Sequence, residues 1–294
     1  MGAVRVLFVT LRTNVLFMES YSTINVRGRL LSLDEPLVMG ILNLTPDSFY
    51  CSSRVKGCGA VERAGEMLAA GAAIIDVGAC STRPGAGFPT QEEELARLHP
   101  VLELLDKEFP EAVVSVDTFR GAVAEECVRE HNVSIINDVS GFEWDSAMFA
   151  AVTKMRVPYI LTHAPAEPGG VVAYDDLVPG VLEYFARKMW QLRQEGVPDI
   201  IIDPGFGFGK DLEQNYRLFG AMEHFSLLDA PLLVGVSRKS MMTKLLDIDA
   251  ASALPATAAL NMAALERGAK ILRVHDVPEA VQVVKLWKAV KSIL

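Results

Sequence analysis

The sequence predicts a TIM (β/α)8 barrel preceded by a short N-terminal β-hairpin, and three observations support this fold class. From Pro36 onward, short apolar runs rich in Val and Ile alternate with longer segments that carry apolar residues at helical spacing, which is the pattern of βα units around a parallel sheet. Eight such units can be counted, the number that closes a barrel of about 250 residues. The strand runs are apolar at nearly every position, as expected when both faces of a sheet are covered.

The elements follow one another in a regular order. The strand candidates are 37–43, 73–78, 112–117, 133–138, 158–163, 200–203, 231–236 and 270–275. The helix candidates between and after them are 61–70, 91–108, 121–130, 145–154, 178–195, 215–221, 255–267 and 278–293. The segment 23–33 alternates in polarity around Arg27-Gly28, which predicts a hairpin that closes the bottom of the barrel.

An open, doubly wound sheet is the alternative fold. It usually has fewer strands, and no Gly-x-Gly-x-x-Gly turn follows the first strand, so the closed barrel is preferred. We assign residues 18–294 to a single barrel domain and residues 1–17 to an N-terminal appendage. The apolar run near the start is broken by Arg5, Arg12 and Asn14, and no cleavage site of a secretory signal follows it. A chain that starts at Met18 is therefore expected to keep full activity.

Composition excludes several classes of protein. The apolar fraction is 50% and the mean hydropathy is +0.25, which exclude a disordered or fibrous chain. The formal net charge is -9 and no long basic run is present, so nucleic acid is not an expected partner. No run approaches about 18 apolar residues, so no membrane span is expected. The 4 cysteines lack CxxC or zinc-site spacing, which is typical of reduced thiols in a cytoplasmic protein.

Polar residues gather where the predicted strands end. In a barrel these carboxyl ends meet on one face, where barrel enzymes hold their active sites. The group that should be partly desolvated there comprises Asp76, Asp117, Asn137, Asp138, Asp203 and Lys239. Buried carboxylates need hydrogen-bond donors, and a flat heterocycle with N–H donors and a carbonyl acceptor would satisfy the whole set. The alternative is that they are strand-end caps and salt bridges.

Potential cations follow the same strand ends in a chain with excess negative charge. They are Arg83, Arg238, Arg273 and His275. The guanidinium fork suits phosphate oxygens, so an anionic substrate group is expected beside the polar cup. Arg83 lies in a loop of small residues that could close over a ligand. For Arg238 we expect a solvated surface position, with Lys239 pointing inward.

Two further features bear on the ligands. Asn43 ends the first barrel strand and could give an amide oxygen to Mg²⁺, or could hydrogen-bond the turn at 45–47. No paired-ligand spacing surrounds His163 or His275, so catalytic zinc is not expected. The loop at 203–210 carries three glycines and two phenylalanines, which either wall a site for a second flat ring or form a turn with Phe206 in the core.

Motifs in this chain closely resemble those of the dihydropteroate synthase family, from about Thr23 to the carboxyl end. They are, in order, MGILNLTPDSF at 39–49, DVG at 76–78 with STRPG at 81–85, SVDT at 115–118, INDVSG at 136–141, DPGFGFGK at 203–210, SRKS at 237–240 and RVHD at 273–276. Each motif alone is weak, but the ordered set is highly specific.

The resemblance implies a barrel enzyme that joins 6-hydroxymethyl-7,8-dihydropterin pyrophosphate to p-aminobenzoate, releasing pyrophosphate and forming 7,8-dihydropteroate for folate synthesis. By motif position it implies a pterin pocket of Asp117, Asn137, Asp203 and Lys239. It implies Arg273 and His275 on the pyrophosphate, with Asn43 as the contact to magnesium. It implies that Thr82, Arg83, Phe208, Lys239 and Ser240 surround p-aminobenzoate, where sulfonamides compete.

We therefore expect a dissociative substitution without a covalent enzyme intermediate. The residues expected to act in catalysis are Arg83, Asp117, Lys239, Arg273 and His275, and those expected to bind substrate are Thr82, Asn137, Asp203, Phe208 and Ser240. The resemblance also implies a homodimer, for which Val281, Val284, Leu286, Trp287 and Val290 of the last helix offer apolar surface.

The chain departs from the family pattern in two places. After Phe49 the family commonly continues Ser-Asp-Gly-Gly, whereas this chain has YCSSR at 50–54. After the fifth strand the family often has Met-His-Met, whereas this chain has Thr162-His163-Ala164. Two alternatives remain, a pterin-binding methyltransferase and a non-catalytic pterin-binding paralogue. The methyltransferases lack the Ser-Thr-Arg-Pro-Gly and Ser-Arg-Lys motifs, and a non-catalytic paralogue would lose the cations that this chain keeps.

Overall fold

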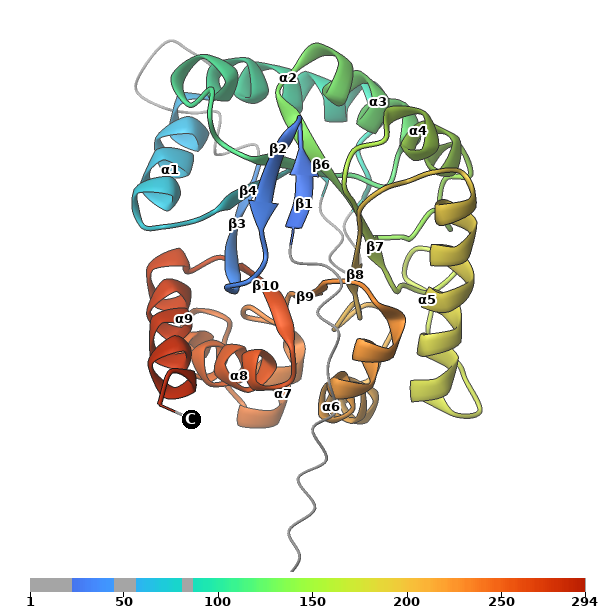
Figure 1. Ribbon diagram of the computed structural model, residues 1–294, viewed down its shortest axis with the longest axis vertical. Coiled ribbons are helices and arrows are strands. Elements are labelled where there is room, and N and C mark those ends of the chain that lie inside the picture. Colours follow the sequence, from blue (N-terminus) through green and yellow to red (C-terminus); the bar gives the residue numbers. More distant parts are fainter. Residues whose placement is uncertain (1–22, 45–56, 81–86, 294) are drawn as a thin grey trace, which may run out of the picture.

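The computed structural model describes residues 23–44, 57–80 and 87–293, which form a closed barrel of eight parallel strands with helices around it (Figure 1). The predicted fold class is confirmed. Around the barrel the strands follow the order β10-β3-β4-β5-β6-β7-β8-β9. Their bounds are β3 Leu37–Asn43, β4 Ile74–Gly78, β5 Val114–Asp117, β6 Val133–Asp138, β7 Tyr159–Thr162, β8 Ile200–Asp203, β9 Leu232–Val234 and β10 Ala269–Val274.

The helices lie outside the strands and cover the sheet (Figure 1). Their bounds are α1 Cys58–Ala69, α2 Gln91–Glu108, α3 Gly121–Glu130, α4 Ala147–Met155, α5 Leu177–Gln194, α6 Leu212–Gly220, α7 Ser240–Leu246, α8 Leu254–Glu266 and α9 Val277–Lys291. Two 3₁₀ helices occupy Met222–Leu228 and Ala251–Ala253. Of these helices, α2 and α3 match the predicted bounds and α7 was not predicted, because its seven residues are too few to show a helical period.

Local sequence accounts for several helix starts. Helix α2 begins after Thr90, whose hydroxyl accepts from the Glu93 backbone N–H at 3.2 Å while the Glu93 carboxylate accepts from the Thr90 N–H at 2.9 Å. This reciprocal capping box satisfies two backbone donors that the helix cannot pair internally. Asp211 and Gln214 form the same arrangement at the start of α6. These caps set the point at which each loop above the barrel turns into its helix.

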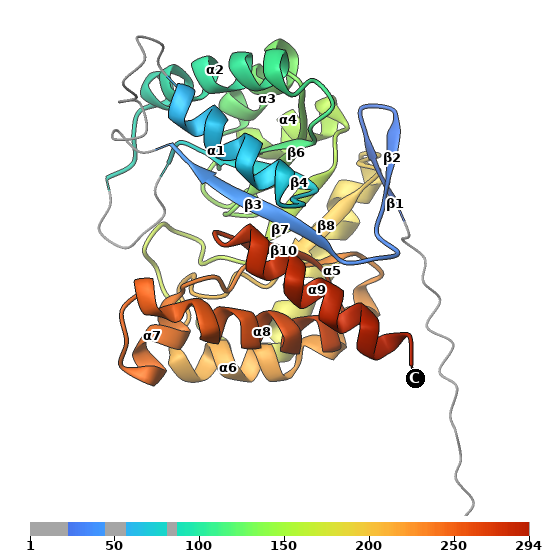
Figure 2. The same cartoon turned by 90° about the vertical axis from the view of Figure 1, so that its left-hand side faces the viewer.

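A hairpin of β1 (Thr23–Val26) and β2 (Arg29–Ser32) lies at the amino-terminal end of β3, as predicted (Figure 2). Its turn places Arg27 and Gly28 at positive φ, 55° and 82°. Apolar side chains of the hairpin, Ile24 among them, pack against the lower barrel interior. The hairpin therefore closes the bottom of the barrel and leaves the carboxyl end as the open one.

The strand register sorts the inward-facing side chains into layers of four, each layer drawn from alternate strands. The lowest complete layer is Ile74, Ile135, Ile201 and Ile271, and the next is Met39, Ser115, Ile160 and Leu233. All but Ser115 belong to one buried apolar cluster. The lower barrel is thus a packed core, and polar chemistry is confined to the layers above it.

Some predictions fall on residues that the structure does not describe. The proposed appendage at 1–17, the altered segment at 50–54, and the site residues Thr82 and Arg83 all lie outside the described residues. Within the described part of the chain, no single helix is long and apolar enough to cross a membrane. One bent pair, 240–246 with 251–266, meets the length and composition criteria only when its two helices are taken together.

Candidate active site

The third interior layer is polar on all four of its strands. It comprises Asp76, Asn137, Asp203 and Arg273, each two residues beyond an isoleucine of the lowest layer. Because side chains alternate between the faces of a strand, these four face the barrel interior as their isoleucines do. The layer above it is Ile41, Asp117, Thr162 and Gly235. We call these two layers together the polar cup.

Arg273 joins three strands across the cup. Its Nε donates to Asp76 Oδ2 at 2.6 Å and its Nη2 donates to Asp117 Oδ2 at 2.5 Å. Asn137 Nδ2 donates to the same Asp76 oxygen at 2.9 Å. The side chain of Asp76 is fully buried, and its Oδ1 has no hydrogen-bond partner among the described residues. A buried carboxylate with one unpaired oxygen is ready to accept a hydrogen bond from a ligand.

The carboxyl group of Asp117 is partly ionised near neutral pH. Burial raises the pKa of its carboxyl to about 7, the Arg273 guanidinium opposes this rise, and the neighbouring Asp76 adds to it. Two carboxylates that share one guanidinium cannot both be fully stabilised as anions. Proton occupancy at Asp117 therefore depends on pH near neutrality.

Lys239, which follows β9, interacts electrostatically with Asp203 of the cup. Burial lowers the pKa of Lys239 to about 8, and Asp203 opposes this change. The Lys239 ammonium donates to Phe206 O at 2.6 Å and lies 4.8 Å from the centroid of the Phe208 ring. Burial raises the pKa of Asp203, which accepts from the Gly205 N–H at 2.8 Å. The pair places one hydrogen-bond donor and one acceptor on the same side of the cup.

The two phenylalanines of the loop after β8 have different roles, a question that the sequence left open. Phe206 is fully buried in the core, whereas Phe208 is partly exposed beside Lys239 and can wall a site. The loop is held by Lys210, whose ammonium donates to His163 O at 3.1 Å, Gly205 O at 2.9 Å and Phe208 O at 3.2 Å. The sequence pattern alone gives Lys210 no role. Three carbonyls that converge on it could be found only in the folded loop.

Other predicted site residues lie at the rim of the cup. His275 follows Arg273 by two residues on the same face, and its Nδ1 lies 3.0 Å from Ser237 Oγ. Asn43 is exposed at the end of β3. A Cβ at Gly78 would lie 3.3 Å from Asp117 Cβ and 3.6 Å from Asn43 Oδ1, so the glycine lets these two side chains approach the same point.

Ser240, the first residue of α7, is exposed. Taken together, these contacts bring most of the predicted site residues into the cup or onto its rim. They are Asn43, Asp117, Asn137, Asp203, Phe208, Lys239, Arg273 and His275.

Two sequence interpretations are wrong. Asp138 does not face the cup, because it follows Asn137 on the strand and so points to the opposite face. Its carboxylate accepts from Tyr159 OH at 2.6 Å and from the Ser140 N–H at 2.8 Å, so for this residue the strand-end cap is correct. Arg238 is not a solvated arginine. Its Nε and Nη2 donate to the two oxygens of Asp276 at 2.8 and 2.7 Å.

Asp76 is the residue whose importance the sequence interpretation missed. The sequence pattern places Asp76 among the polar strand ends, but the family resemblance gives it no role in the site. In the structure it accepts hydrogen bonds from both Arg273 and Asn137. The available signal was an aspartate inside an otherwise apolar strand, IIDVG. Its partners lie 197 and 61 residues away, so only the closed barrel identifies them.

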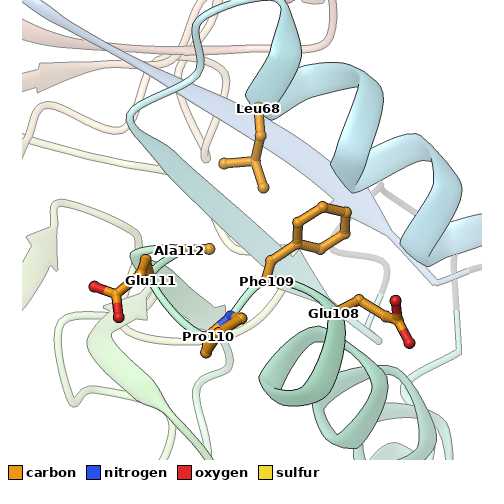
Figure 3. A pocket seen from close by; sticks show the side chains of 6 residues that line it. All are labelled: Leu68, Glu108, Phe109, Pro110, Glu111 and Ala112. Atoms are coloured by element: carbon orange, nitrogen blue, oxygen red, sulfur yellow. The ribbon is translucent and has the colours of Figure 1, made fainter.

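An open depression elsewhere on the described surface is not the site. It is lined by Leu68, Glu108, Phe109, Pro110, Glu111 and Ala112 (Figure 3). Leu68 and Phe109 point toward one another, whereas the two carboxylates point to opposite sides (Figure 3). The depression precedes β5 and therefore lies at the amino-terminal end of the barrel, away from the cup.

The fold and the cup define a barrel enzyme whose mouth binds a flat, donor-rich ring, and the comparisons agree. The family described as "Pterin binding enzyme" matches residues 39–275. Dihydropteroate synthase of Escherichia coli (strain K12) is 40% identical over 272 residues, covering 90% of this chain and 95% of the relative. The chain belongs to the dihydropteroate synthase family, which is a family of transferases.

Solved structures support the same conclusion. Yersinia pestis dihydropteroate synthase in a sulfonamide drug complex matches with a TM-score of 0.85 and 36% identity, covering 92% of this chain and 99% of that chain. The Xanthomonas albilineans synthase with 4-aminobenzoic acid matches with a TM-score of 0.84 and 35% identity, covering 92% and 98%. These findings favour a synthase over the methyltransferase alternative.

Proposed function

We propose that the protein condenses 6-hydroxymethyl-7,8-dihydropterin pyrophosphate with p-aminobenzoate to give 7,8-dihydropteroate and pyrophosphate, in folate biosynthesis. The observation that carries this proposal is the polar cup, in which Asp76, Asp117, Asn137, Asp203, Lys239 and Arg273 converge above an apolar barrel core. A desolvated set of acceptors with one ammonium complements a bicyclic ring that carries several N–H donors and a carbonyl acceptor.

The pterin ring is bound by groups of opposite hydrogen-bonding character. Asp117 and Asp203, when ionised, accept from ring and amino N–H groups, and Asn137 Oδ1 is an additional acceptor because its Nδ2 already donates to Asp76. Lys239, on the same side as Asp203, donates to a ring acceptor. Phe208, 4.8 Å from the Lys239 ammonium, provides an apolar wall for the p-aminobenzoate ring, and the motif positions assign Ser240, Thr82 and Arg83 to the same ring.

Arg273 and His275 act on the diphosphate. In the described structure the Nε and Nη2 of Arg273 contact carboxylates, and its Nη1 remains available to an anion. The bond between the pterin methylene carbon and the diphosphate oxygen breaks first, and pyrophosphate leaves with the electron pair. The resulting methylene cation is stabilised by resonance in the ring and by the carboxylates of the cup. The aniline nitrogen then attacks the cation and loses a proton, so no covalent enzyme intermediate forms.

Magnesium fits this site as a companion of the diphosphate. Among the described residues, no three His, Cys, Asp or Glu side chains are arranged to hold a metal ion. Mg²⁺ commonly binds through few protein oxygens together with substrate phosphates, and Asn43 Oδ1 is a hard oxygen beside the cup. Asn43 would therefore hold the ion with the diphosphate oxygens. When bound, the ion supplies neutralisation of the charge on the departing pyrophosphate.

The pH dependence of the reaction follows from two groups of the cup. Asp117, with a pKa of about 7, accepts with both oxygens and carries a negative charge only when it is ionised, and Lys239, with a pKa of about 8, carries its positive charge only when it is protonated. We expect kcat/KM to rise as pH increases through about 7 and to fall above about 8. Steady-state rates of the wild-type chain and of Asp117→Asn test this. The acid limb should disappear in the variant, and an unchanged acid limb there would assign it to another group.

The raised pKa of Asp117 also affects the stability of the fold. The carboxyl of Asp117 binds a proton more tightly in the folded chain than in the unfolded chain, where its pKa is near 3.8. Its contribution to stability is therefore complete below that value and is lost as the pH rises through about 7.

One assay tests the proposed reaction. Release of pyrophosphate from the pterin pyrophosphate is measured with and without p-aminobenzoate and with and without Mg²⁺. We expect release to require both and to equal the amount of 7,8-dihydropteroate formed. Methyl transfer to a corrinoid without pyrophosphate release would reject the proposal in favour of the methyltransferase. Binding of the pterin without turnover under any of these conditions would favour the non-catalytic paralogue.

Assembly and location belong to the same proposal. Of the apolar residues of α9 that were expected at a homodimer interface, Val284 is buried and Val281 packs on the core. Leu286 and Val290 remain exposed by 61% and 54% and support a homodimer through this helix, which sedimentation equilibrium tests. Cys80 and Cys127 are free thiols. Because thiols stay reduced in the cytoplasm, they support a cytoplasmic location.

A further inference from the structure

Two hydroxyl groups inside the barrel are buried without a partner among the described residues. They are Ser115 Oγ and Thr162 Oγ1, and their residues are 0% and 1% exposed. A buried polar group without a hydrogen bond is unfavourable and is uncommon in native proteins. Each of these hydroxyls is therefore a candidate to bind a ligand that enters the barrel.

The strand register separates the two hydroxyls by one layer. Ser115 lies level with Met39, Ile160 and Leu233, below the layer of Asp76 and its partners. Thr162 lies above that layer, directly opposite Asp203 in the register and level with Asp117. Ser115 is therefore separated from the mouth by the charged layer, whereas Thr162 lies buried in the layer nearer the mouth.

The surroundings of Thr162 fix its orientation. Its methyl carbon Cγ2 lies 3.2 Å from the position that a Cβ at Gly205 would take. Its carbonyl accepts from the hydroxyl of Tyr184 of α5 at 3.2 Å. Gly205 has φ +66°, and a Cβ there would lie 2.0 Å from His163 O, so this close packing requires glycine. The methyl group thus lies toward Gly205, and the hydroxyl stays buried without a partner in the interior layer of Asp117.

From this position we infer that Thr162 determines specificity for the pterin, its hydroxyl forming a hydrogen bond with the polar edge of the ring. The inference rests on the proposed function, since it concerns the ring bound in the same cup. Ionised carboxylates only accept and an ammonium only donates, but a hydroxyl does either. A ligand with a nitrogen or oxygen at this point pairs the hydroxyl, whereas one with a carbon there leaves it buried and unpaired. Thr162 thus discriminates between rings by a desolvated polar contact.

The test compares three variants of the full chain. Thr162→Val removes the hydroxyl and keeps the shape, Thr162→Ser keeps the hydroxyl and removes the methyl group, and Ser115→Ala removes the matched hydroxyl one layer below. Titration calorimetry with 6-hydroxymethylpterin, which lacks the diphosphate, reports the ring contact alone. We expect Thr162→Val to weaken binding about tenfold, and Thr162→Ser and Ser115→Ala to stay within about twofold of wild type. The KM for p-aminobenzoate should not change in any of them.

The outcomes separate the inference from the proposed function. If the wild type binds the pterin and releases pyrophosphate but Thr162→Val binds equally well, the inference alone is wrong. Equal losses in Thr162→Ser and Thr162→Val would show that packing of the whole side chain, and not the hydroxyl by itself, controls binding, and would overturn it as well. Failure of the wild type to bind the pterin would overturn both. Circular dichroism checks the fold, and Thr162→Ala replaces the valine variant in the comparison if that variant unfolds.

Discussion

Replacing Arg273 with alanine is expected to lower kcat/KM by about 10³-fold or more, which corresponds to about 4 kcal/mol of lost transition-state stabilisation. The guanidinium contacts both Asp76 and Asp117, at 2.6 and 2.5 Å. Its removal takes a cation from the departing diphosphate and leaves two buried carboxylates without their partner. The loss should appear in kcat as well as in KM, because the charge on the leaving group grows only as the bond breaks.

The same variant should remain folded but be less stable. Removing one partner of a buried ion pair typically lowers the free energy of unfolding by about 3–5 kcal/mol. Chemical denaturation measures this change, and circular dichroism checks that the barrel persists. The matched control is Arg217→Ala, because Arg217 pairs with Asp176 on the surface, where both side chains are more than half exposed. It should change stability by less than about 1 kcal/mol and leave turnover unchanged. Undiminished turnover in Arg273→Ala would contradict the role given to this residue.

Replacing Lys239 with alanine is expected to abolish measurable turnover while the fold is retained. Lys239 is the cationic donor that faces Asp203, and its contacts with Phe206 O and the Phe208 ring place it between the two proposed ring sites. Its loss removes a donor to the pterin and the largest of the positive charges that act on the buried Asp203, the others being Arg273 and Lys210. Because burial lowers the pKa of Lys239 to about 8, the alkaline limb of the wild-type pH profile should belong to this residue.

The control for this variant comes from α7, the helix that begins directly after Lys239. Lys244 of α7 is exposed, so Lys244→Ala should leave both kcat/KM and the alkaline limb unchanged. Lys239→Arg keeps a positive charge that does not titrate near pH 8, so any residual activity should lack the alkaline limb. An alkaline limb that persists near pH 8 in Lys239→Arg would show that another group controls it.

Most of the architecture could be predicted from local patterns. Apolar runs such as IIDVG and VSIIND mark strands buried on both faces, and helices such as α2 and α3 have the predicted bounds because caps and apolar spacing lie within a few residues of each end. The prediction that the polar strand ends share one face followed from the parallel order of the strands alone. Asp117, Asn137, Asp203, Lys239 and Arg273 accordingly meet in the cup.

Pairing within the cup depends instead on the closed barrel. The hydrogen bonds from Arg273 to Asp76 and Asp117 span 197 and 156 residues. No pattern in a short segment encodes a contact of β10 with β4 and β5. The layer to which each side chain belongs depends on the stagger between neighbouring strands around the barrel. That stagger separates Thr162, at the mouth, from Ser115, in the core, and it follows from packing and hydrogen bonding among all eight strands together.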